Sequence, residues 1–141
     1  MNYNYNVLIS TLILRNDILS LLKLYFQNDN IYDLLDSSNL VERQEPWISY
    51  LYQEIESNFP LMLDCYISTE VSYEMELGLA QSIAQKYNCN CIIMNGNCPY
   101  TGLMVNSCGK ITLVSEQNDN QFKICNDTSC CTNYSCFFKN L

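Results

Sequence analysis

The chain of 141 residues contains no histidine. This absence excludes Ser-His and Cys-His nucleophilic sites, histidine-ligated metals and the usual proton shuttle near neutral pH. Glycine is scarce as well, and the four glycines, at positions 78, 96, 102 and 109, form neither a P-loop nor a dinucleotide-binding motif. Most familiar enzyme classes are therefore excluded, and we expect a protein without catalytic residues, cofactor or metal.

Basic residues are also few. Seven Lys and Arg stand against fifteen Asp and Glu, which gives a formal net charge of −8. A phosphate backbone repels a molecule with this charge, whereas a basic protein is attracted to it. We therefore expect a protein partner with a basic surface and no direct binding of nucleic acid.

The first residues lack a basic leader, and their apolar run, about eight residues long before Arg15, is too short to span a bilayer. We therefore predict a cytoplasmic protein without membrane association. The length suits one domain that can bury a sizeable core. We predict that residues 1–141 form a single domain whose last part, residues 125–141, is irregular and rich in cysteine.

The clearest pattern lies between residues 60 and 95. Two apolar segments, at residues 61–67 and 89–94, flank a stretch from Thr69 to Asn88 in which apolar residues recur at helical spacing. This pattern predicts a strand, a helix and a second strand. Because one face of the helix is apolar, we expect that face to lie on a sheet.

The segment before this pattern is predicted to open with a strand. Residues 3–13 alternate in a way that suits a strand buried more deeply towards its end, and an earlier helix start is the competing interpretation. A helical stripe follows at residues 18–26, for which Asn16 or Asp17 is the expected cap.

Two further helices are predicted from turn and cap signals, a short one at residues 31–35 and a longer one at residues 46–57 that opens with a proline. Later in the chain, residues 101–106 and 111–115 are predicted to pair as a hairpin, and residues 122–125 to add a short last strand. Helices gather early and strands late, which is typical of the α+β class. We expect a single domain with an antiparallel or mixed sheet of four to six strands and helices packed on one face.

Carboxylate pairs are the remaining candidates for acid and base chemistry. The sequence offers Glu54 with Asp64 and Glu74 with Glu76. Glu74 and Glu76 are two positions apart on a predicted helix, so their side chains point apart. A solvated helix face whose acids favour the helix N-terminus is the simpler interpretation of that pair.

Nine cysteines are many for a cytoplasmic protein. One possible set of zinc ligands is Cys89, Cys91, Cys98 and Cys108, and another is Cys125, Cys130, Cys131 and Cys136. The spacing departs from the C-x2-C pairs of zinc ribbons, because Cys89 and Cys91 fall on one face of a predicted strand with Ile93. Reduced thiols acting as small apolar residues are favoured, with disulfides near the C-terminus and a zinc site as alternatives.

Negative charge is concentrated in the middle of the chain. Between Asn28 and Leu77 lie eleven acidic residues and one basic residue, Arg43. The acidic residues are Asp29, Asp33, Asp36, Glu42, Glu45, Glu54, Glu56, Asp64, Glu70, Glu74 and Glu76. Ordinary solvated surface is one interpretation of this segment. The other is an electric field that steers a cationic partner towards the protein.

Aromatic residues of the types enriched at interface hot spots are interleaved with these acids. They are Tyr32, Trp47, Tyr50, Tyr52, Tyr66 and Tyr73. An acidic and aromatic segment favours a docking surface for a basic protein. The candidate partner-binding residues are Glu42, Glu45, Glu54, Glu56, Glu70, Tyr73 and Glu74.

A small, acidic, single-domain α+β chain without catalytic groups resembles the bacterial immunity proteins of contact-dependent growth inhibition and other polymorphic toxin systems. The resemblance is most visible in the strand-helix-strand pattern of residues 61–94 and in the acidic middle. It implies a non-catalytic antitoxin that binds the C-terminal domain of a cognate toxin, often a basic nuclease, and neutralises it through protein-protein interaction. A viral accessory protein that binds a host factor is the main alternative, and a small enzyme with paired carboxylates is a third.

Overall fold

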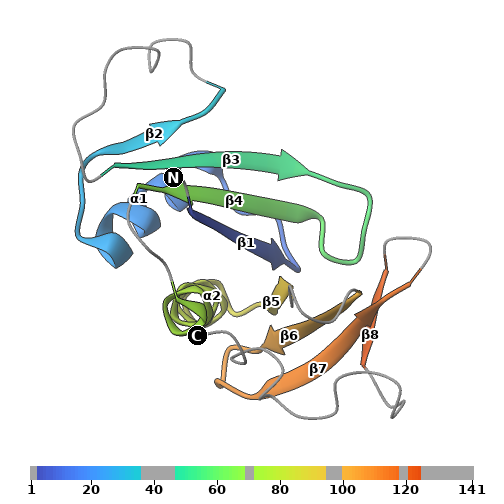
Figure 1. Ribbon diagram of the computed structural model, residues 1–141. Coiled ribbons are helices and arrows are strands. Elements are labelled where there is room, and N and C mark those ends of the chain that lie inside the picture. The colour runs from blue at the N-terminus through green and yellow to red at the C-terminus, as the bar shows by residue number, and fades with distance from the viewer. Residues whose placement is uncertain (1–2, 36–46, 69–71, 95–99, 118–120, 125–141) are drawn as a thin grey trace.

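The computed structural model describes residues 3–35, 47–68, 72–94, 100–117 and 121–124 (Figure 1). The elements in chain order are β1 (Tyr3–Ile9), α1 (Arg15–Phe26), β2 (Ile31–Asp33), β3 (Ile48–Glu54), β4 (Leu61–Ile67), α2 (Tyr73–Tyr87), β5 (Cys91–Met94), β6 (Thr101–Val105), β7 (Ile111–Glu116) and β8 (Phe122–Ile124). The α+β class is thus confirmed. The expected four to six strands are too few, because eight strands form one mixed sheet.

The opening strand is the centre of this sheet, whose order is β2-β3-β4-β1-β5-β6-β7-β8. β1 pairs along its whole length with β4, from Tyr3↔Ile67 to Ile9↔Leu61, but with β5 only at residues 7–9. All neighbouring strands are antiparallel except β2 and β3, which are parallel. Within β1, Asn4 is exposed, Asn6 is half-buried and Leu8 is buried, so burial deepens along the strand as predicted. The strand ends at Ile9 rather than at residue 13, and Thr11 and Leu12 are exposed.

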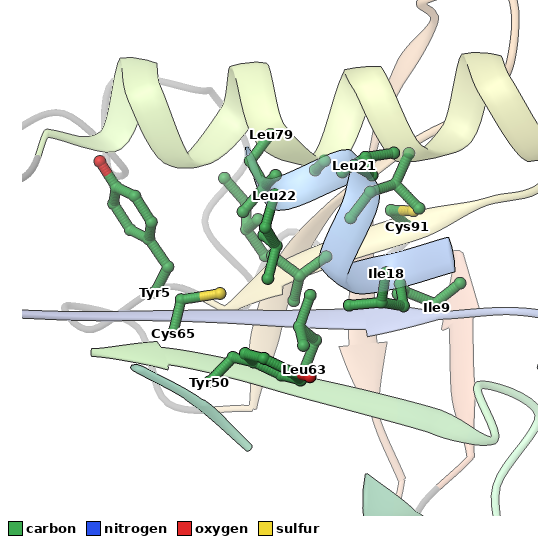
Figure 2. Packing of buried hydrophobic residues seen from close by; sticks show 14 of the residues in the cluster. Tyr5, Ile9, Ile18, Leu21, Leu22, Tyr50, Leu63, Cys65, Leu79 and Cys91 are labelled. Carbon is green, nitrogen blue, oxygen red and sulfur yellow. The ribbon is translucent and has the colours of Figure 1, made fainter. Parts of the chain in front are cut away.

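Both helices pack on one face of the sheet, which we call the helix face. Figure 2 shows the main core there, where Ile18, Leu21 and Leu22 of α1 and Leu79 of α2 lie above the strands. The strands contribute alternate residues, as the pleat of a strand requires. These include Tyr5, Val7, Ile9, Tyr50, Leu63, Cys65, Cys91 and Ile93. The predicted strand-helix-strand corresponds to β4, α2 and β5, and the predicted hairpin to β6 and β7.

Two predicted helices are strands instead. Residues 31–33 form β2 and residues 48–54 form β3, where helices were expected at 31–35 and 46–57. In β3, Ile48 and Tyr50 alternate towards the helix face, and the backbone pairs with β4 on one side and with β2 on the other. The helical spacing of apolar residues is a weak local preference, because most of the stability of a helix comes from packing its apolar face. In β3 the hydrogen bonds to two neighbouring strands and the burial of one face stabilise the strand instead.

The predicted cap of the first helix is also wrong. α1 begins at Arg15 after Leu14, whose side chain makes no capping hydrogen bond, whereas Ser72 caps α2 by accepting from the backbone of Met75 at 3.2 Å. Arg15 instead forms an ion pair with Asp33 at 2.6 Å, which ties the start of α1 to β2. In the part of the chain that the structure describes, neither helix combines the length and apolar composition needed to cross a bilayer.

The opposite face of the sheet has a smaller core of its own. It consists of Leu8, Phe59, Ile92, Val114 and Phe122, with Ile55, Met62, Met94 and Met104 packed against it. These residues come from both halves of the sheet, so the sheet curls over this face. In Figure 1 the connection between β3 and β4 accordingly reaches towards β8.

Candidate partner-binding surface

The predicted partner-binding residues are only partly described. Glu42, Glu45 and Glu70 lie outside the described residues, and Tyr73 is described as the first residue of α2 without its side chain. Glu54, Glu56 and Glu74 are exposed.

The structure brings Glu54 and Glu56 together and places Glu74 elsewhere. Glu54 ends β3 opposite Leu61, whereas α2 with Glu74 follows the far end of β4, where Ile67 pairs with Ile48. A strand of this length spans about 20 Å. The residues of the predicted surface are therefore divided between the two opposite ends of the β3–β4 strand pair.

Glu54 and Glu56 belong to a structured connection that we call the hairpin tip, residues 54–60. The backbone of Ile55 donates to the carbonyl of Pro60 at 2.8 Å, and the backbone of Phe59 donates to the hydroxyl of Ser57 at 3.0 Å. These bonds stabilise the turn between β3 and β4.

Asn58 fastens the hairpin tip to the last described strand. Its side-chain amide donates to the carbonyl of Phe122 at 2.9 Å, and its side-chain oxygen accepts from the backbone of Phe122 at 2.9 Å. The Asn58 carboxamide thus occupies the outer edge of β8 as one residue of a neighbouring strand would. The rings of Phe59 and Phe122 meet edge to face, with centroids 5.6 Å apart. No sequence signal distinguished Asn58 from the many other asparagines of the chain.

The two glutamates of the hairpin tip differ from most acids around them. In the described part of the chain, the carboxyl groups of Glu54, Glu56 and Glu74 form no ion pair and no hydrogen bond. Asp33 is paired with Arg15, and Asp64 is buried and accepts from the Asn6 amide at 2.5 Å. The acidic middle is therefore less negative at the surface than its sequence indicates.

The interleaved tyrosines of β3 serve the core. Tyr50 is 2% exposed and packs on the helix face. The hydroxyl of Tyr52 donates to the carbonyl of Ile13 at 2.6 Å, and the Arg15 guanidinium lies 4.8 Å from the centre of its ring. Burial raises the pKa of Tyr52. These two aromatic residues stabilise the fold, so of the candidate groups on β3 and the hairpin tip only the glutamates are exposed.

Neither carboxylate pair considered for catalysis is assembled. Asp64 lies opposite Leu51, and Glu54 lies opposite Leu61, so the two acids point to different faces of the sheet. Glu74 and Glu76 both lie in the first turn of α2, but the side chain of Glu74 is exposed whereas that of Glu76 is buried, with 8% of it exposed. The two carboxyl groups are therefore not a pair.

Glu76 is the most unusual acid in the structure. β5 pairs with β1 only at residues 7–9, so β5 does not cover the backbone of Asn6. The carboxyl group of Glu76 accepts a hydrogen bond from this backbone. Burial raises the pKa of Glu76 to about 8, although the hydrogen bond from Asn6 opposes this shift. Figure 2 shows the buried Tyr5 side chain directed towards the same end of α2. Burial also raises the pKa of Tyr5.

Four cysteines are described, and all are free thiols. Cys65, Cys89 and Cys91 are buried in the main core and Cys108 is exposed, which agrees with thiols acting mainly as small apolar residues. Cys98, Cys125, Cys130, Cys131 and Cys136 lie outside the described residues. Among the residues that are described, no three Cys, Asp or Glu side chains are grouped as metal ligands.

We expect Asn58→Ala to lower the free energy of unfolding by about 2 kcal/mol, because two hydrogen bonds to the backbone of Phe122 are lost and each contributes roughly 1 kcal/mol. Urea unfolding measures this difference. Asn4→Ala is the matched control, since Asn4 is exposed on β1 and makes no side-chain hydrogen bond in the described structure. Equal losses in both variants would contradict the bracing role of Asn58.

Comparison of this chain with protein-family models, curated proteins and solved structures finds no match.

Proposed function

We propose that this protein is a non-catalytic immunity protein that binds and neutralises the basic C-terminal domain of a cognate toxin. The hairpin tip is the proposed contact surface. The observation that carries the proposal concerns Glu54 and Glu56, which are exposed and have no ion-pair partner among the described residues. They lie on a turn that Asn58 fastens to β8.

The physical argument begins with desolvation. A carboxylate that already has a protein partner, such as Asp33, must break that interaction before it binds another cation. Glu54 and Glu56 have no such interaction to lose within the described structure. Lys or Arg side chains of a toxin can therefore pair with them directly.

The bracing of the turn adds a second contribution. Ordering a loop on binding costs conformational entropy, and a loop that is already ordered avoids this cost. The hydrogen bonds of Asn58 and the contact between Phe59 and Phe122 order the hairpin tip before a partner arrives. If the toxin is a nuclease, the two carboxylates would take the places of nucleic-acid phosphates in its basic cleft.

The test uses the toxin domain encoded by the reading frame next to the gene for this protein. Coexpression should restore growth to cells that make this domain, and the purified proteins should form a complex. We expect Glu54→Lys with Glu56→Lys to slow association about tenfold at low salt, because the reversed charges repel the basic partner. The difference should shrink at high salt, where exposed charges are screened.

A control variant separates local contact from net charge. Asp17→Lys with Asp29→Lys changes the net charge by the same amount at exposed positions away from the hairpin tip. We expect this variant to associate at nearly the rate of the unmodified protein. If both double variants slow association equally, the hairpin tip is not the contact surface. If the unmodified protein neither protects cells nor binds the domain, the proposed function is wrong.

A further inference from the structure

A groove of about 440 Å³ lies between α1 and α2, which is a volume typical of small-molecule sites. Each helix contributes three lining residues, namely Leu21, Leu24 and Tyr25 from α1 and Ser82, Gln85 and Lys86 from α2. Leu21 is buried, whereas Leu24 is 74% exposed. The groove therefore has a mainly apolar wall on α1 and a polar wall on α2 that carries one positive charge.

Tyr25 joins the two helices at one end of the groove. Its hydroxyl donates to the carbonyl of Met75 at 2.7 Å. A Cβ atom on Gly78 would lie 2.5 Å from that hydroxyl oxygen, so the glycine leaves the space that the Tyr25 ring needs to reach α2. Lys86 follows eight residues after Gly78 on the same helix, which corresponds to about 12 Å along α2.

The polar groups on the α2 wall are available to a ligand. In the part of the chain that the structure describes, the side chains of Ser82, Gln85 and Lys86 have no hydrogen-bond or ion-pair partner. The ammonium group of Lys86 lies 5.7 Å from the centre of the Tyr87 ring. An ammonium group offers three hydrogen-bond donors and no acceptor, so Lys86 favours an anionic group in the groove.

We propose that this groove binds a medium-chain carboxylate, with its chain along the α1 wall and its carboxylate beside Lys86. The chain is stabilised because it covers the apolar surface of Leu21, Leu24 and Tyr25 and removes it from water. A saturated chain of about ten carbons matches the length of α2 between Gly78 and Lys86. This site is separate from the hairpin tip and goes beyond the proposed toxin neutralisation.

The net charge of −8 opposes the binding of anions to the protein as a whole. The affinity must therefore come from two local contributions, the apolar wall and the single charge of Lys86. These contributions can be measured separately, because a fatty alcohol has the same chain as a fatty acid without the charge.

An NMR titration of the full chain with decanoate, below its micelle concentration, tests the site. The amide signals of the lining residues should shift and saturate, while those of Glu54 and Glu56 at the hairpin tip should not move. Hexanoate is four methylenes shorter and should bind about tenfold more weakly, because each half-buried methylene contributes roughly a factor of two. Decanol should shift the same amide signals.

The charge is tested by two lysine variants. Lys86→Gln should weaken decanoate binding about threefold, which is the size of an exposed ion pair, and should leave decanol binding unchanged. Lys23→Gln is the matched control, because Lys23 is exposed in the last turn of α1 and does not line the groove. It should change the binding of neither ligand.

The apolar wall is tested by two leucine variants. Leu24→Ser should weaken the binding of decanoate and of decanol, each about fivefold. Leu14→Ser is the matched control, because Leu14 is also 74% exposed but does not line the groove. It should leave both affinities unchanged.

The proposal is overturned if decanoate causes no saturable shift, or if Lys86→Gln and Lys23→Gln bind it equally well. Equal losses in Leu24→Ser and Leu14→Ser would also overturn it, because they would indicate adsorption to any exposed leucine. Amide shifts at the groove that depend on protein concentration without decanoate would indicate a second copy of the chain as the occupant, and the proposal would be wrong.

Discussion

Replacing Glu76 with Gln is expected to stabilise the protein at alkaline pH, by roughly 4 kcal/mol near pH 9. Burial raises the pKa of Glu76 to about 8 from an ordinary value of 4.5. The folded protein therefore holds a proton on this carboxyl group under conditions in which the unfolded chain has released it. Glutamine has nearly the same shape, still accepts from the backbone of Asn6 and never ionises.

The sign follows from linkage. A carboxyl group with a raised pKa in the folded state contributes its full stability below about pH 4.5, and this contribution is lost as the pH rises towards 8. Between these values the unmodified protein should lose about 1.4 kcal/mol per pH unit relative to Glu76→Gln. Above pH 8 the difference should level off.

Urea unfolding at about pH 5, 7 and 9 measures the effect. Glu74→Gln is the matched control, because Glu74 lies in the same first turn of α2 but is exposed. Its removal should change the free energy of unfolding by only a few tenths of a kcal/mol through the helix dipole, with little dependence on pH. A constant difference between the unmodified protein and Glu76→Gln from pH 5 to pH 9 would contradict the buried position of this carboxyl group.

Adding a methyl group at Gly102 is expected to destabilise the protein by about 2 to 3 kcal/mol. Gly102 is buried in β6, on the face over which the sheet curls. A Cβ atom there would lie 2.7 Å from Cγ2 of Ile92, 3.0 Å from the carbonyl oxygen of Ile93 and 3.2 Å from the sulfur of Met94. Ile92 is fully buried and the carbonyl belongs to the adjacent strand, so the neighbours have little room to move.

Gly78→Ala is the informative comparison, because its Cβ would meet only the end of the Tyr25 side chain. Tyr25 can rotate away at the cost of its hydrogen bond to the carbonyl of Met75, and alanine favours the helix by about 1 kcal/mol over glycine. We therefore expect Gly78→Ala to change stability much less than Gly102→Ala. Chemical unfolding of both variants checks the order, and equal losses would mean that crowding at β6 is not the cause.

The central part of the fold was predictable because its signals are local and agree with one another. The spacing of Leu79, Ala80 and Ile83 permits one apolar helix face, and that face packs on the sheet. The flanking apolar segments are short and became β4 and β5. The hairpin of β6 and β7 was predictable for the same reason, since a turn signal separates two alternating runs.

The region around β3 was not predictable in this way. Trp47, Tyr50, Leu51, Glu54 and Ile55 have helical spacing, while Ile48, Tyr50 and Tyr52 alternate as in a strand. The two patterns share residues, so the sequence supports both. The strand forms rather than the helix because the backbone of β3 pairs with β4 on one side and with β2 on the other, and these pairings are not visible in the local sequence.

The candidate surface was predictable in composition but not in arrangement. The sequence alone determines that the middle of the chain is acidic and that histidine chemistry is absent. Only the tertiary structure decides that Asp33 meets Arg15 and that Asp64 and Glu76 are buried. It also decides that Glu54 and Glu56 lie exposed on a turn braced by Asn58, without an ion-pair partner in the described part of the chain. The physical reason is that charge is a property of each residue, whereas its solvation and its partners depend on contacts between segments far apart in the chain.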